Sequence, residues 1–122
     1  MSYQAVWIRF FVVTVLIEMA VALPLLARST PTSAASEWGT WPRRVLVVLI
    51  ANFATHPFVW FVLARLGWSR LWLTLVGEAW AVGFETVVYA LAIPLPRSRA
   101  LAVSALANGA SFTLGHLAGH LM

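Results

Sequence analysis

The sequence lacks cysteine and lysine and carries little charge of either sign. Without cysteine, its 122 residues can form no disulfide, thiolate nucleophile or cysteine-ligated metal centre. Charged residues make up 10% of the chain, whereas a soluble globular domain carries about 25%. Hydrophobic residues make up 61%, and the mean hydropathy is +0.86. This composition indicates an integral membrane protein, because so few charges cannot solvate a globular surface.

All basic side chains are arginines, and the net charge is +4. They are spread thinly and stand mostly at the ends of apolar runs, where arginine sets topology and contacts lipid headgroups. No basic patch or nucleic-acid-binding motif is present, so we expect no nucleic-acid partner.

Four apolar runs of membrane-spanning length predict an all-α fold, an antiparallel bundle of four transmembrane helices. The expected helices cover residues 6–27, 43–66, 70–93 and 99–120. A polar interfacial loop, residues 28–41, joins the first two, and residues 1–122 form one domain without an internal repeat. The first run is expected to be a retained helix, because it exceeds the ~7–15 residues of a signal peptide and contains Glu18.

The predicted connections follow from helix-breaking residues. Gly67 is expected to end the second helix and Ser69 to cap the third, which makes that connection short and its helices antiparallel neighbours. Pro94 and Pro96 end the third helix, and Ser98 is expected to cap the fourth. Five arginines near the first and third loops, against three near the termini, place both termini outside the cytoplasm of a bacterial-type inner (plasma) membrane.

Polar residues interrupt every run, and helix rise lets their depths be compared. At about 1.5 Å per residue, one residue from each helix falls roughly 16–21 Å from the end that carries the termini, near the midplane of a hydrocarbon core about 30 Å thick. This layer holds Glu18, Asn52, Glu85 and Asn108. A second layer, nearer the termini, holds His56, Glu78 and His116. Ser111 shares a helix face with Asn108.

Three hypotheses fit these residues. Acids inside a membrane mark proton or ion pathways, so Glu18 and Glu85 are candidates for proton or cation handling. Alternatively, both acids only hydrogen-bond Asn52 and Asn108 and hold the helices together. In a third interpretation, His56, Glu78 and His116 ligate a metal, since imidazole and carboxylate suit zinc or iron. No ligand motif accompanies them, and we expect no cofactor.

Asn52-x-x-Thr55-x-Pro57, Glu78-x6-Glu85 and Asn108-x-x-Ser111 together resemble a pattern in short, uncharacterised bacterial four-span proteins. The resemblance covers the last three helices and implies the four-span fold without an activity. In size and in a first-helix acid, Glu18, the chain is also similar to small multidrug transporters. Its long Ser/Thr-rich loop and its third-helix acids depart from that pattern.

The sequence therefore favours a proton- or cation-linked transporter or channel-like protein over an enzyme. The alternatives are a non-catalytic accessory or assembly subunit of a membrane complex, and an intramembrane metal-binding protein or enzyme. Expected partners are the lipid bilayer, a small ion or small-molecule ligand, and further copies or a larger complex, because four short helices enclose little space alone.

Overall fold

The computed structural model describes the backbone of residues 2–29 and 41–121, with side chains up to Leu117. Four long helices and one short 3-10 helix follow in order: α1 Tyr3–Ser29, α3 Trp41–Phe61, η1 Leu63–Leu66, α4 Arg70–Ala92 and α5 Arg97–Leu121. The predicted all-helical fold is confirmed, and each predicted boundary lies within a few residues of the observed one. Most of the predicted polar loop lies outside the described residues.

The α3–α4 connection forms as the sequence predicts. Gly67 ends η1 with φ +69°, a left-handed conformation that glycine adopts without strain. Ser69 caps α4 by accepting a hydrogen bond from the Trp72 backbone N–H at 3.4 Å. The prediction that Ser98 caps the last helix is wrong: α5 begins at Arg97, directly after Pro96, whose fixed φ suits a residue at a helix start.

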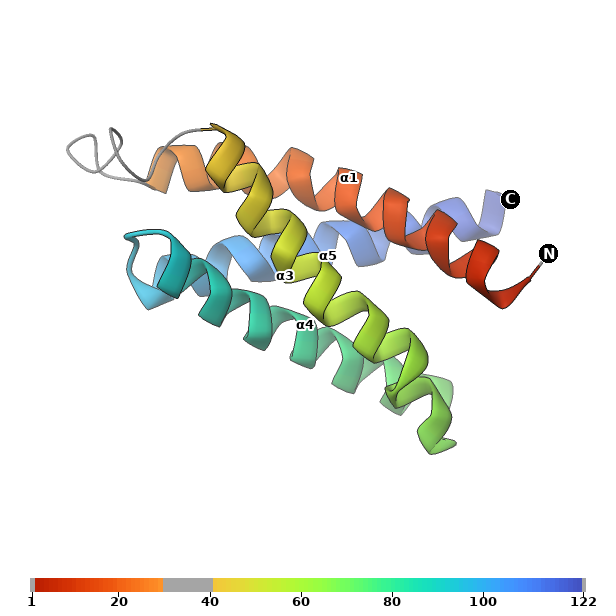
Figure 1. Ribbon diagram of the computed structural model, residues 1–122. Helices are drawn as coiled ribbons and strands as arrows, with labels where there is room; N and C mark the ends of the chain where they lie inside the picture. Colours follow the sequence, from red (N-terminus) through yellow and green to blue (C-terminus); the bar gives the residue numbers. More distant parts are fainter. Residues whose placement is uncertain (1, 30–40, 122) are drawn as a thin grey trace.

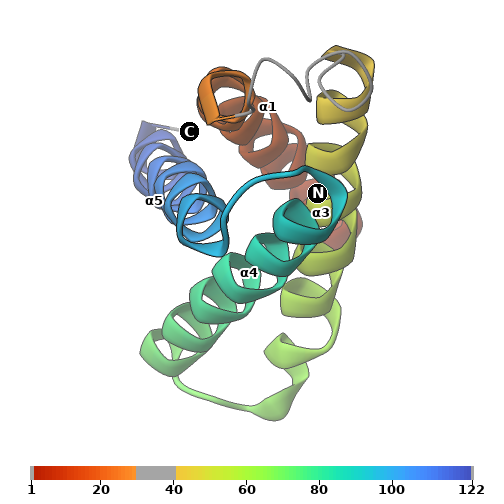
Figure 2. The same cartoon turned by 90° about the vertical axis from the view of Figure 1, so that its left-hand side faces the viewer.

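The four long helices alternate in direction, and both termini lie at one end of the bundle (Figure 1). Seen from the opposite end, they stand in the order α1, α3, α4, α5, and each contacts its two neighbours (Figure 2). Toward the end that carries the termini, the pair α1/α5 diverges from the pair α3/α4 (Figure 1). The bundle is therefore wedge-shaped, closed at one end and spread at the other.

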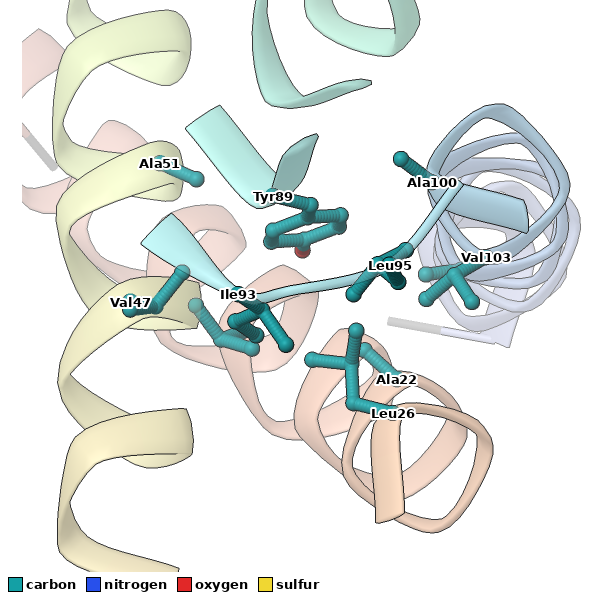
Figure 3. Packing of buried hydrophobic residues seen from close by; sticks show 11 residues of the cluster. Ala22, Leu26, Val47, Ala51, Tyr89, Ile93, Leu95, Ala100 and Val103 are labelled. Atoms are coloured by element: carbon teal, nitrogen blue, oxygen red, sulfur yellow. The ribbon is translucent and has the colours of Figure 1, made fainter. Parts of the chain in front are cut away.

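An apolar cluster fills the closed end, where Tyr89 packs among side chains from α1, α3 and α5 (Figure 3). Its buried members are Ala22, Leu26, Val47, Val48, Ala51, Tyr89, Ile93, Leu95, Ala100, Val103 and Ala107. Burial of these side chains stabilises the convergent half of the bundle. The Tyr89 hydroxyl is buried there without a hydrogen-bond partner among the described residues.

The outer surface is apolar, while the interior holds polar groups. Leu16, Leu71 and Leu91 are 63%, 66% and 81% exposed, whereas Glu18, Asn52 and Glu85 are each 1% exposed. Among the described helices, α1, the segment Trp41–Leu66 and α4 are long and apolar enough to cross a membrane. The fourth predicted span, α5, falls outside that set, and its polar residues account for this.

Candidate functional site

Glu18 and Glu85 lie inside the bundle, each held by donors from two neighbouring helices. Glu18, on α1, accepts a hydrogen bond from Asn52 Nδ2 of α3 at 2.7 Å and another from Ser111 Oγ of α5 at 2.9 Å. Each of its carboxyl oxygens therefore has a donor. Such bonds to a buried carboxyl group are among the stronger ones in proteins.

Glu85, on α4, has three donors. Asn108 Nδ2 of α5 donates to Oε2 at 2.6 Å, Ser104 Oγ to the same oxygen at 3.3 Å, and Thr55 Oγ1 of α3 to Oε1 at 3.3 Å. Thr55 lies one turn beyond Asn52, so α3 serves both glutamates. In the same way, α5 serves both through Asn108 and Ser111.

Together with the helix turns that join Asn52 to Thr55 and Asn108 to Ser111, these bonds form a ring that passes through all four long helices. We call it the carboxyl ring; its members are Glu18, Asn52, Thr55, Glu85, Asn108 and Ser111. Each asparagine also uses its second N–H, donating to the backbone oxygen four residues earlier, at 3.1 Å to Val48 and 3.0 Å to Ser104. The amide orientations are thus fixed by the helices that carry them.

The carboxyl ring repeats itself between two helix hairpins, α1–α3 and α4–α5. In each hairpin, the asparagine donates to Oε2 of the glutamate in its own hairpin. In each, the hydroxyl three residues later donates to Oε1 of the glutamate in the other hairpin. The same two bonds therefore occur twice, four in all, which is the hydrogen-bond pattern of two equivalent halves.

Burial and sequence follow the same repeat, so the expectation of no internal repeat is wrong. The buried residues of α3 are Arg44, Val47, Val48, Ala51, Asn52 and Thr55. A shift of 56 residues takes them to six buried residues of α5: Ala100, Val103, Ser104, Ala107, Asn108 and Ser111. The signal in the sequence is Ala-Asn-x-Ala followed by Thr or Ser, which begins at Ala51 and again at Ala107.

A cavity of about 410 Å³ occupies the spread half of the bundle. It extends from the helix ends at Tyr3, Ala64 and Leu73 to the carboxyl ring, all six members of which line it. Beyond the ring lies the apolar cluster. Each long helix lines the cavity, so a single chain supplies this space, and assembly with further copies stays a prediction.

His56 lines the cavity above the ring and is held by aromatic neighbours. Trp7 Nε1 donates to His56 Nδ1 at 3.1 Å, so Nδ1 acts as the acceptor. The imidazole stacks on Trp60 with ring centroids 6.0 Å apart and meets Phe11 at 5.2 Å. Helix α3 continues through Pro57 to Phe61, so this polar stretch lies on a continuous helix.

Glu78 and His116 also line the cavity. Glu78 precedes Glu85 by two turns on α4 and is half-buried. Unlike the ring glutamates, it has no hydrogen bond or ion pair with the side chains described for residues 2–29 and 41–117. In the same part of the chain, no group of three or more His, Cys, Asp or Glu is arranged to hold a metal ion, which gives the His56, Glu78 and His116 interpretation no support.

The structure thus brings every predicted site residue to one cavity, while their binding role stays a prediction. Depth counting alone placed the midplane four together, but it did not identify Thr55 and Ser104 as donors to Glu85. It also could not show that the aromatic side chains of Tyr3, Phe10 and Phe112 line the same space.

No protein-family model, curated protein or solved structure matches the chain.

Proposed function

We propose that the protein spans a bacterial-type plasma membrane and binds a small cation in its cavity, as a proton- or cation-linked transporter or channel-like protein. The distribution of side chains supports the membrane setting. A protein folded in water buries apolar side chains and leaves polar ones exposed. This bundle does the reverse, because it buries a polar ring and exposes apolar side chains on every long helix, as a protein surrounded by lipid would.

The observation that carries the proposal is the cavity and the charge of its lining. Three of the four acidic residues of the chain line it, and none of the eight arginines is among its lining residues. A space with carboxyl groups and without arginine favours a proton or a cation and disfavours an anion. Its volume lies within the range of about 300–1,000 Å³ typical of small-molecule sites.

The cavity ends at the carboxyl ring, because the apolar cluster closes the bundle beyond it. Such a state gives access from one end only. Transport would then need a second state in which the cluster opens and the cavity closes, as in proteins of the alternating-access type. The two equivalent hairpins are natural moving units, since parallel repeats in transporters move against each other.

Reconstitution into liposomes tests the proposal. Purified full-length protein is placed in vesicles that contain a pH-sensitive dye, and proton flux is followed after a membrane potential or an opposing cation gradient is imposed. We expect flux above that of empty vesicles, and its loss in Glu18→Gln and Glu85→Gln. Glu37→Gln is the matched control, because it makes the same chemical change in the polar connection. Flux that survives both ring substitutions would contradict the proposal.

The saturated hydrogen bonds of the ring favour a second candidate, a non-catalytic subunit in which the ring only holds the helices together. In that case the wild-type protein gives no flux, and the ring substitutions reduce stability alone. Co-purification of a stoichiometric membrane partner would support this candidate.

A further inference from the structure

Glu78 differs from the other two carboxyl groups of the cavity, because no described side chain donates a hydrogen bond to it. Glu18 and Glu85 are each 1% exposed and accept hydrogen bonds from two and three donors. Glu78 lines the same cavity, nearer the spread end, and accepts none in the part of the chain that the structure describes. Partial burial without a donor makes the ionised carboxyl group costly, and a proton or a bound cation would offset that cost.

The side chains that line the cavity together with Glu78 limit what kind of cation fits. They include aromatic rings from three helices, Tyr3 and Phe10 of α1, Trp60 of α3 and Phe112 of α5. Ring faces attract cations, and carboxylate with aromatic walls is the chemistry that recognises organic ammonium groups. A metal ion needs several oxygen or nitrogen ligands, and the described residues include no group of three or more His, Cys, Asp or Glu that could hold one.

Glu18, Glu85, His56 and His116, which also line the cavity, already contact other side chains. Glu18 on α1 and Glu85 on α4 are saturated within the ring, and His56 on α3 has its Nδ1 bonded to Trp7. His116 on α5 lies against Phe112, with ring centroids 6.2 Å apart. Among the described acids that line the cavity, Glu78 is therefore the one without a hydrogen-bond donor, and aromatic side chains line the same space.

From this arrangement we infer that Glu78 anchors an organic ammonium ligand, whose charge lies at the carboxylate and whose apolar part packs against the aromatic walls. The inference rests on the proposed function, since it names the substrate class of the same cavity. The carboxyl ring forms the floor beneath the ligand. The cavity extends toward the helix ends at Tyr3, Ala64 and Leu73, and this end provides the route of entry.

Binding in detergent tests the inference without requiring transport. The probe is benzyltrimethylammonium, and its neutral isostere neopentylbenzene, in which carbon replaces nitrogen, is the matched ligand. Calorimetric titration of the full chain is expected to show that the ammonium binds at least about tenfold more tightly than the isostere, given about 1.5–3 kcal/mol for an interaction with a charged group. Sodium at equal concentration is expected not to displace it.

Two variants test whether the preference for the ammonium over its neutral isostere depends on Glu78. Glu78→Gln is expected to weaken ammonium binding by about tenfold or more while leaving neopentylbenzene binding unchanged. Glu37→Gln is expected to bind both ligands as the wild type does. Equal binding of the two ligands by the wild type, unchanged ammonium binding in Glu78→Gln, or no ammonium binding at all would each overturn the inference.

The two proposals fail separately. Ammonium binding that depends on Glu78, with no flux in vesicles, would overturn transport and leave the binding site standing. Cation-linked flux that is unchanged in Glu78→Gln would overturn the role of Glu78 alone.

Discussion

The floor of the cavity, formed by the carboxyl ring, and its upper part, nearer the helix ends, both contain glutamates, but these glutamates differ in their hydrogen bonds. On the floor, the carboxyl ring gives every glutamate oxygen a donor, and each asparagine uses both of its N–H groups. Above it, Glu78 has no donor in the described part of the chain. Residue type and depth alone therefore do not reveal the role of a buried carboxyl group; its partners do.

The internal repeat also separates the carboxyl ring from the upper part of the cavity. Ring positions occur twice, once in each hairpin, whereas the distinctive upper residues occur once. The 56-residue shift that relates α3 to α5 takes His56 to Phe112. Aligning Glu18 with Glu85 in the same way places Phe11 opposite Glu78. The two hairpins therefore carry equivalent residues in the carboxyl ring, where they hydrogen-bond each other, and different residues in the upper cavity, where a ligand would enter.

The largest expected effect comes from removing either ring asparagine. Asn52→Ala and Asn108→Ala each leave a buried carboxyl group without its shortest hydrogen bond, and each should lower the free energy of unfolding by about 3 kcal/mol. Equal losses would sharpen the equivalence of the two hairpins. Denaturant titration in detergent measures both, with Thr113→Ala as control, because that exposed hydroxyl bonds only the Gly109 backbone oxygen. A loss in only one variant would break the equivalence.

The hydroxyl donors should show where the halves are unequal. Ser111→Ala removes one of two donors to Glu18 and is expected to cost about 1.5 kcal/mol. Thr55→Val removes one of three donors to Glu85, so a smaller cost of about 0.5–1 kcal/mol is expected. The same unfolding measurement compares the two variants, and the reverse order would contradict the donor count.

Tyr89 tests the closed end of the bundle. Its hydroxyl is fully buried in the apolar cluster, and none of the described residues forms a hydrogen bond with it. Tyr89→Phe keeps the ring and removes the unsatisfied group, so stability is expected to stay the same or rise by up to about 1 kcal/mol. The melting temperature in detergent reports the change, and a clear loss of stability would mean that the hydroxyl has a partner in the folded protein.

The smallest effect on stability is expected at Glu78. Since its carboxyl group holds no other residue, Glu78→Gln should change the free energy of unfolding by less than about 0.5 kcal/mol. Unfolding curves for this variant and for Glu85→Gln, recorded together, give the contrast between the upper cavity and the floor. A large loss at Glu78 would place it with the ring.

The sequence predicts those parts of the fold that depend on local signals. Apolar runs and helix breakers give the helices within a few residues, and Gly67 and Ser69 form the turn they predict. Helix rise is constant, so counting residues also groups Glu18 with Asn52 and Glu85 with Asn108. The cross-hairpin bonds of Thr55 and Ser111 depend on how each helix is rotated, and the cavity depends on how far the pairs diverge. Neither the rotation of a helix nor the divergence of the helix pairs can be predicted from one apolar segment of the sequence.

The hydrogen bond from Ser111 to Glu18 can form only late in the synthesis of the chain. Ser111 follows Glu18 by 93 residues, and a ribosome adds about 5–20 residues per second. The first helix therefore waits roughly 5–20 seconds for its last donor, with Asn52 of its own hairpin as the earlier one. Until α5 is made, the nascent chain holds a half-satisfied acid, so the carboxyl ring can close only after α5 has been synthesised.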